Sequence, residues 1–168
     1  VRLALGHFGR LDGAFISVGG PPKGGALENT DGQWRAAFES VFLAAVRVTR
    51  AVVDGAPGAV RLAYVLSTSV KAPIPGLAIS NGLRPGLAMW VKQLANEIGP
   101  SGSRAVGLMP GTIDTERIQT VYDTEEKRQA NTAAIPLGRF GKPAEFGKVA
   151  AFALSDAGSY LNGCIIAV

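Results

Sequence analysis

The chain has 168 residues, of which 47% are hydrophobic, and a formal net charge of +4, which suits one domain with a substantial core. Its basic residues are scattered and its longest apolar stretch carries charges, so the sequence predicts neither nucleic-acid binding nor a membrane span. One His and one Cys exclude a multi-histidine metal site and an intrachain disulfide, and no signal-peptide pattern is present, so we expect a cytoplasmic protein.

The first half of the sequence predicts two strands separated by a long helix. The apolar run "GAFISVGG" at 13–20 ends in glycines, as a buried strand often does, and a loop rich in Gly and Pro follows at 21–32. A helix is expected over 33–53 because apolar residues recur there at spacings of three and four, and Asp31 is placed to cap it. After the turn "DGAPG", residues 59–67 predict the second strand.

The second half predicts two more strands and three helices. Pro85 has no backbone N–H, so the helix that ends near Ile98 is expected to start at about residue 82, no more than one turn before the proline. The other elements are a strand, a polar helix, a helix that opens with Pro and a final strand, at 103–111, 115–131, 143–154 and 163–168. Because strands alternate with helical connections of crossover length, this order predicts a parallel sheet with helices on both faces.

Four stretches of the sequence carry a resemblance to a known family. They are "FGRLDGAFISVGGPP", "VLSTS", "VGLMPGTIDTER" and the run from "IPLGRFGKP" to "GCIIAV". In that order they resemble four features of the short-chain dehydrogenase/reductases: the fourth strand with its Asn-Asn-Ala-Gly signature, the strand end with the catalytic Ser, the Pro-Gly-x-Ile-x-Thr stretch beside the nicotinamide, and the C-terminal run. The resemblance covers nearly the whole chain and is closest to the 3-oxoacyl-(acyl carrier protein) reductase-like branch.

The resemblance implies an α/β fold of the Rossmann type, a doubly wound parallel sheet with its N-terminal part absent, so that residues 1–168 form a single, partial dinucleotide-binding-type domain. It also implies an oxidoreductase that uses NAD(P)(H) on a small-molecule carbonyl or hydroxyl substrate. The implied cofactor contacts are Gly19, Pro110, Gly111, Ile113 and Thr115. The last two match residues beside the nicotinamide carboxamide. The alternative for this stretch is a plain strand-to-helix turn.

The sequence departs from the family's pattern at the cofactor phosphates. Family members open with a strand and the turn Thr-Gly-x-x-x-Gly-x-Gly, whose backbone holds the pyrophosphate at a helix N-terminus. No stretch of these 168 residues matches that turn, so either upstream residues are missing or the protein is naturally short. We therefore expect this chain to bind NAD(P)H weakly or not at all.

A second departure concerns the catalytic residues. Ser67 matches the family's catalytic Ser, but the Tyr-x-x-x-Lys pair falls on Ser80 and Arg84. A serine hydroxyl is a much weaker acid than a phenol, and a guanidinium keeps its proton, so the usual protonation of the carbonyl oxygen is missing. The three residues could still polarise a carbonyl, and we expect a weakly active or inactive oxidoreductase. The structural alternative is that Ser80 caps a helix and Arg84 is a solvated residue of its first turn.

A serine ester hydrolase is a second function that these residues leave open. The stretch "AISNG" at 78–82 is a variant of the Gly-x-Ser-x-Gly nucleophile elbow, in which Ser80 would be the nucleophile. Such an esterase would need His7 as its base and Asp12 or Asp114 to orient that base. Against it, an elbow normally follows a strand directly, and the preceding "PIPGLA" does not resemble a strand.

The resemblance further implies a homo-oligomer. In the family, the helices after the fourth and fifth strands pack against their twins, and here they would be residues 33–53 and 82–98, with Trp90 on the outer rows of the second helix. In the family's strand order the first strand lies beside the fourth. Residues 13–18 would then be an unpaired apolar edge, which favours association.

Overall fold

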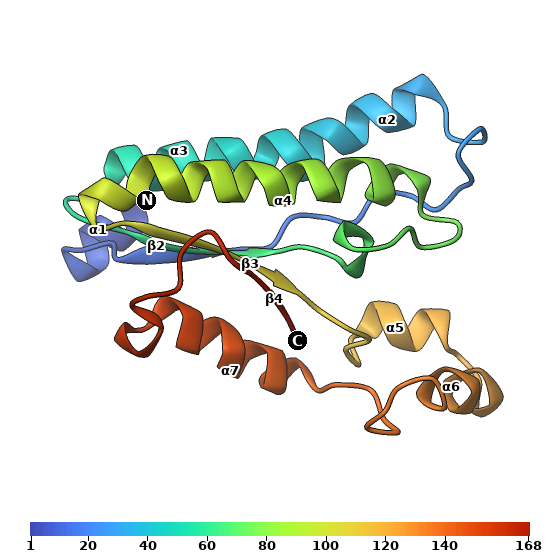
Figure 1. Ribbon diagram of the computed structural model, residues 1–168. Helices are drawn as coiled ribbons and strands as arrows, with labels where there is room; N and C mark the ends of the chain where they lie inside the picture. The colour runs from blue at the N-terminus through green and yellow to red at the C-terminus, as the bar shows by residue number, and fades with distance from the viewer.

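The computed structural model describes residues 1–168 and contains one sheet of four strands in the order β1-β2-β3-β4 (Figure 1). The strands are β1 (Gly13–Ile16), β2 (Arg61–Val65), β3 (Arg104–Met109) and β4 (Ile165–Ala167). Each lies within a strand predicted from the sequence, and all neighbouring pairs are parallel. The predicted parallel sheet is therefore confirmed, and β1 and β4 are its edges.

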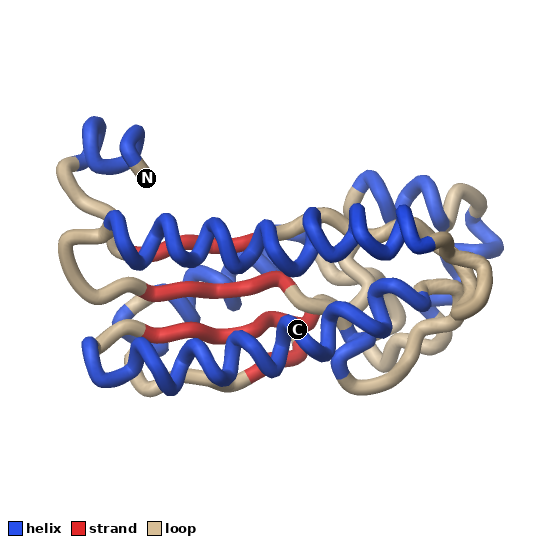
Figure 2. The backbone as a smooth tube through the Cα atoms, turned by 90° about the horizontal axis from the view of Figure 1, so that it is seen from above, coloured by secondary structure: helices blue, strands red, loops and turns tan.

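Helices cover both faces of the sheet, as predicted. On one face lie α2 (Asp31–Ala37), η1 (Phe38–Leu43), α3 (Ala44–Gly55) and α4 (Ala78–Ile98); on the other lies α7 (Pro143–Leu154) (Figure 1). The helix α1 (Arg2–Phe8) lies near the end of the sheet where the strands begin, whereas α5 (Glu116–Val121) and α6 (Glu125–Thr132) lie beyond their carboxyl ends (Figure 2). Single helical turns form η2 (Thr68–Val70), η3 (Gly99–Ser101) and η4 (Asp156–Gly158).

Three consecutive segments, α2, η1 and α3, make up the helix predicted over 33–53. Its cap is Thr30 rather than the predicted Asp31: Thr30 Oγ1 accepts from the Gln33 N–H at 3.3 Å, and Gln33 Oε1 accepts from the Thr30 N–H at 2.8 Å. This reciprocal pair satisfies two N–H groups that the first turn leaves free. Asp31 is instead the first helical residue, where its negative charge suits the positive end of the helix dipole.

The helix α4 starts earlier than predicted, about two turns before Pro85. Its first turn is tied to the preceding loop, because Asn81 Nδ2 donates to the Ile74 carbonyl at 2.9 Å and Asn81 Oδ1 accepts from the Ile74 N–H at 3.0 Å. Pro85 therefore removes one backbone hydrogen bond from a helix that is already anchored. The predicted polar helix over 115–131 also differs, since it is divided into α5 and α6.

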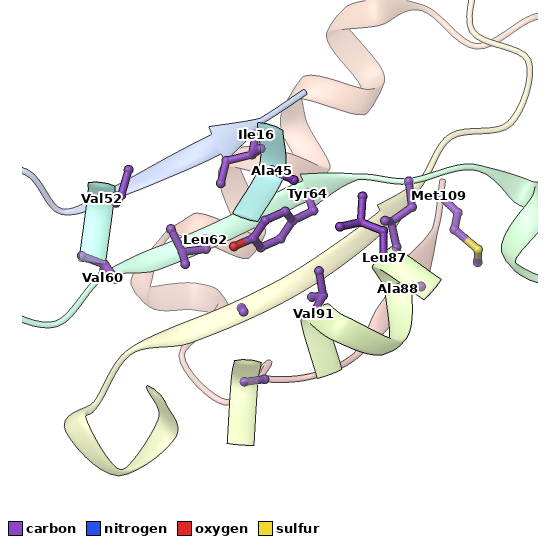
Figure 3. Close-up of a cluster of buried hydrophobic side chains, with 13 residues drawn as sticks. Ile16, Ala45, Val52, Val60, Leu62, Tyr64, Leu87, Ala88, Val91 and Met109 are labelled. Atoms are coloured by element: carbon purple, nitrogen blue, oxygen red, sulfur yellow. The ribbon is translucent and has the colours of Figure 1, made fainter. Parts of the chain in front are cut away.

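The main apolar core lies between the sheet and the layer of α3 and α4 (Figure 3). The strand β3 is buried along its whole length. Trp90 is half-buried and lies edge-on against Tyr64, with ring centroids 6.0 Å apart, so it is not the outward-facing residue that the sequence predicted. Association through α4 stays a prediction. The large apolar side chain that α4 exposes to solvent is Met89, which is 65% exposed. No helix combines the length and the apolarity needed to cross a bilayer.

We predict that the buried Tyr64 makes the fold sensitive to high pH. Its hydroxyl lies 2.7 Å from Thr49 Oγ1, and burial raises its pKa from 10.0 to about 12. Because the folded pKa exceeds the unfolded one, the stabilisation is complete below pH 10 and is lost as the pH rises to about 12. The loss amounts to about 2–3 kcal/mol.

Denaturant unfolding between these pH values would measure this loss. The variant Tyr64→Phe should show a flatter pH dependence, while Tyr160→Phe, at a fully exposed tyrosine, should behave as the parent protein. A Tyr64→Phe protein that keeps the full alkaline loss would show that another group causes it.

Candidate active-site cleft

A cleft of about 460 Å³ opens at the carboxyl ends of the strands. Ligands of open α/β sheets bind at this edge. The loops after β1 and β3 supply half of its lining residues, and β1, β2, α4, α5 and α7 supply the others. Four of the five predicted cofactor contacts line it, namely Pro110, Gly111, Ile113 and Thr115. The fifth, Gly19, adjoins the lining residue Gly20.

The loop after β3 is held in place from its far side. The Asp114 N–H donates to the Gly141 carbonyl at 2.8 Å, and the Gly141 N–H donates to the Thr112 carbonyl at 2.9 Å. A Cβ on Gly141 would overlap the end of the Ile113 side chain, so Gly141 lets that side chain pack closely against the backbone. The N–H of Ile113 and the hydroxyl of Thr115 have no hydrogen-bond partner within the protein. The loop therefore brings free polar groups to the cleft.

Arg84 lies inside the cleft wall and is only 6% exposed, which contradicts the alternative of a solvated first-turn residue. One terminal nitrogen donates to the Val65 carbonyl at 2.8 Å, and the other donates to the Gly19 carbonyl at 3.1 Å. Its guanidinium thus joins the end of β2 to the loop after β1. Its Nε is buried without a partner. Burial first, and then the positive charge of Arg117, lower the pKa of Arg84.

The two predicted catalytic serines, Ser67 and Ser80, both contact a third serine, Ser69. Ser80 is buried, and its Oγ lies 3.3 Å from Ser69 Oγ. Ser67 Oγ in turn accepts from the Ser69 N–H at 3.2 Å. Ser80 does not cap α4, because the N-cap position is Leu77 and no side chain caps it. Neither Ser67 nor Ser80 lines the cleft, so Arg84 is the predicted catalytic residue that reaches it.

The arrangement needed for a serine hydrolase is not assembled. His7 lies on α1, at the end of the molecule opposite the start of α4, and its ring packs against Phe8 (Figure 1). Both candidate orienting carboxylates are paired with arginines, Asp12 with Arg10 at 2.6 Å and Asp114 with Arg128 at 3.3 Å. Ser80 therefore has no base within reach.

Two residues near the site were missed by the sequence analysis. Ser69 is the buried partner of Ser80, and a third hydroxyl in "STS" was the signal for it. Arg117 lines the cleft from α5, two residues after Thr115 in the quoted "DTER" stretch. A Cβ on Gly20 would overlap its guanidinium, so Arg117 lies directly against the loop after β1. The cleft thus contains two arginines and no Tyr, His, Lys or carboxylate.

Comparisons with known proteins agree with this fold. A family model described as enoyl-(acyl carrier protein) reductase matches residues 1–168. The chain is 30% identical over 173 residues to the 2-dehydro-3-deoxy-D-gluconate 5-dehydrogenase of Pseudoalteromonas atlantica, covering 100% of this chain and 67% of the relative. It is 30% identical over 172 residues to a probable 2,4-dienoyl-CoA reductase of Bacillus subtilis, covering 98% and 67%. The chain spans about two thirds of the length of these relatives.

Solved structures show the same architecture. The L-sorbose reductase of Gluconobacter frateurii, in complex with NADPH and L-sorbose, superposes with a TM-score of 0.91 at 25% identity, covering 99% of this chain and 68% of that one. An NADPH-bound short chain oxidoreductase of Pseudomonas aeruginosa, described as containing an atypical catalytic center, superposes with a TM-score of 0.89 at 24% identity, covering 99% and 67%. The family model, the curated relatives and the fold agree, and the chain belongs to the short-chain dehydrogenase/reductase family.

Proposed function

We propose that the chain acts on a carbonyl or hydroxyl substrate through a nicotinamide cofactor, and that it does so slowly. The observation that carries this proposal is the convergence of Pro110, Gly111, Ile113, Thr115 and Arg84 on one cleft. The curated relatives are named as a dehydrogenase and a reductase, which fits this reaction class. No geometric feature favours an ester hydrolase.

The residues around the cleft fit the nicotinamide end of the cofactor. The free N–H of Ile113 and the free hydroxyl of Thr115 are suited to a carboxamide, which both accepts and donates hydrogen bonds. Part of the cleft wall is apolar and is formed by Phe15, Ile113 and Phe146. Small-molecule sites are commonly lined in this way. When bound, a reduced nicotinamide supplies a hydride to the carbonyl carbon. The Gly-rich pyrophosphate turn is missing from these 168 residues, so we propose weak binding of the whole dinucleotide.

The cleft lining contains no acidic side chain that could protonate the substrate oxygen. Arg84 holds its charge near the ends of β1 and β2 and can stabilise a developing oxyanion electrostatically. Ser80 is tied to Ser69 and lies behind the wall rather than at its surface. The proton that balances carbonyl reduction would therefore come from water, which forfeits the roughly 10²–10⁴-fold contribution of a positioned acid.

A titration with reduced nicotinamide mononucleotide tests the proposed site without needing a pyrophosphate turn. In a ¹⁵N-labelled protein, the amide signals of Gly111, Ile113 and Thr115 should shift in a saturable way. The amide of Gly55, at the end of α3 away from the cleft, should stay unchanged. Shifts confined to other regions, or no saturation, would contradict the proposal.

A further inference from the structure

We infer that Arg84 and Arg117 form an anion site within the cleft and that this site takes the carboxylate of a small oxo-acid substrate. The inference rests on the proposed function for the reaction, and it adds the substrate class. Neither arginine has a carboxylate partner in the structure, although seven other ion pairs are formed along the chain.

The surroundings of Arg84 are incomplete for a buried charge. Burying a guanidinium is unfavourable unless its donors are satisfied and its charge is compensated. Arg84 donates to two neutral carbonyls and its Nε is buried without a partner. The one charged side chain that shifts its pKa is the positive Arg117, which lowers it in addition to burial.

A second buried arginine shows what a purely structural site looks like in the same protein. Arg104, which is 8% exposed, donates to four backbone carbonyls, those of Ala153, Ser155, Gly158 and Leu161. Burial first, and then the positive Arg61, lower the pKa of Arg104, and the negative charge of Asp156 partly opposes them. Arg84 has half as many acceptors and no negative neighbour. The comparison indicates that its missing partner comes from outside the chain.

Arg117 supplies the second positive charge and keeps it available. Its guanidinium lies on Gly20, next to the residue whose carbonyl accepts from Arg84. It forms no ion pair, and its side chain is exposed at the mouth of the cleft. The two guanidiniums therefore approach the same loop, one buried and one open. Guanidiniums bind carboxylates and phosphates through paired charge-assisted hydrogen bonds.

The position of this pair points to a substrate acid group rather than to a distant anchor. Arg84, Arg117, Ile113 and Thr115 all line one cleft of about 460 Å³. In a short oxo acid the carbonyl lies within a few bonds of the carboxylate. With the carboxylate on the arginines, that carbonyl remains in the cleft that we assign to the nicotinamide.

The test compares acetoacetate with its neutral methyl ester in the absence of nucleotide. Acetoacetate should raise the thermal midpoint in a saturable way at constant ionic strength, and methyl acetoacetate should not. Arg84→Met would also break the link between the end of β2 and the loop after β1, so the test is built on Arg117→Met. This exposed substitution should weaken acetoacetate binding about tenfold or more. The matched control is Arg50→Met, an exposed arginine on α3, which should bind as the parent does.

Three outcomes would overturn the inference. They are equal stabilisation by the acid and the ester, equal acetoacetate affinity in Arg117→Met and the parent, and an Arg117-dependent response to inorganic phosphate with none to acetoacetate. The last outcome would assign the pair to a nucleotide phosphate. Because these measurements contain no nicotinamide, their failure is distinguishable from failure of the mononucleotide titration.

Discussion

The double variant Ser80→Tyr, Arg84→Lys is expected to reduce a carbonyl substrate about 10²–10⁴-fold faster than the parent cleft when both are joined to the Gly-rich strand–turn–helix segment of a family reductase. The added segment is needed because this chain has no pyrophosphate-binding turn. The introduced Tyr supplies the missing acid, and the introduced Lys lowers the pKa of that Tyr. Steady-state oxidation of NADPH measures the gain.

Two controls make this result specific. The single variant Ser80→Phe adds a ring without a hydroxyl and should not raise the rate. The thermal midpoint of each variant shows whether the larger side chain fits beside Ser69, the present neighbour of Ser80. A correctly folded double variant that binds NADPH and reduces no faster than the parent would show that the acid is not what the cleft lacks.

The substitution Arg104→Met is expected to lower the free energy of unfolding by about 3–4 kcal/mol. Arg104 connects β3 to the end of α7 and to the turn before β4 through four carbonyls. The carbonyls of Ala153 and Leu161 lose their donor once the guanidinium is removed, whereas those of Ser155 and Gly158 also accept from backbone N–H groups. Hydrogen bonds to charged groups are among the stronger ones, and unpaired buried acceptors add a desolvation cost.

Urea unfolding of Arg104→Met beside Arg50→Met measures this contribution. The control removes an exposed guanidinium from α3 and should change the midpoint little. A loss in Arg104→Met below about 1 kcal/mol would mean that water satisfies the carbonyls.

The strands could be predicted from the sequence because each is a short apolar run bounded by turn or loop residues. The segment from Arg104 to Met109 is buried throughout, and its apolar composition after Arg104 predicts that burial directly. Helix starts were less predictable because side chains decided them. Thr30 caps the first helix instead of Asp31 because it exchanges hydrogen bonds with Gln33. The helix α4 begins before the start expected from Pro85 because Asn81 binds the backbone of the preceding loop.

The candidate site was only partly predictable for a similar reason. The resemblance placed Ile113 and Thr115 in the right loop, and the structure brings both to the cleft. It could not supply Arg117, which lies two residues beyond the Pro-Gly-x-Ile-x-Thr pattern and whose guanidinium lies against Gly20 in the loop after β1. Nor could spacing reveal that Ser80 would turn to Ser69. Contacts between distant segments decide such details.

The absence of an acid from the cleft is tested most directly by the pH dependence of NADPH oxidation, measured on the unmodified chain joined to the Gly-rich segment of a family reductase. Its lining residues contain no group that titrates near neutral pH. We expect a slow rate, below about 1 s⁻¹, that changes little between about pH 6 and about pH 9. A fast rate that falls with a sigmoidal profile as the pH rises would show that the cleft holds a working acid, and the proposed slow reaction would then be wrong.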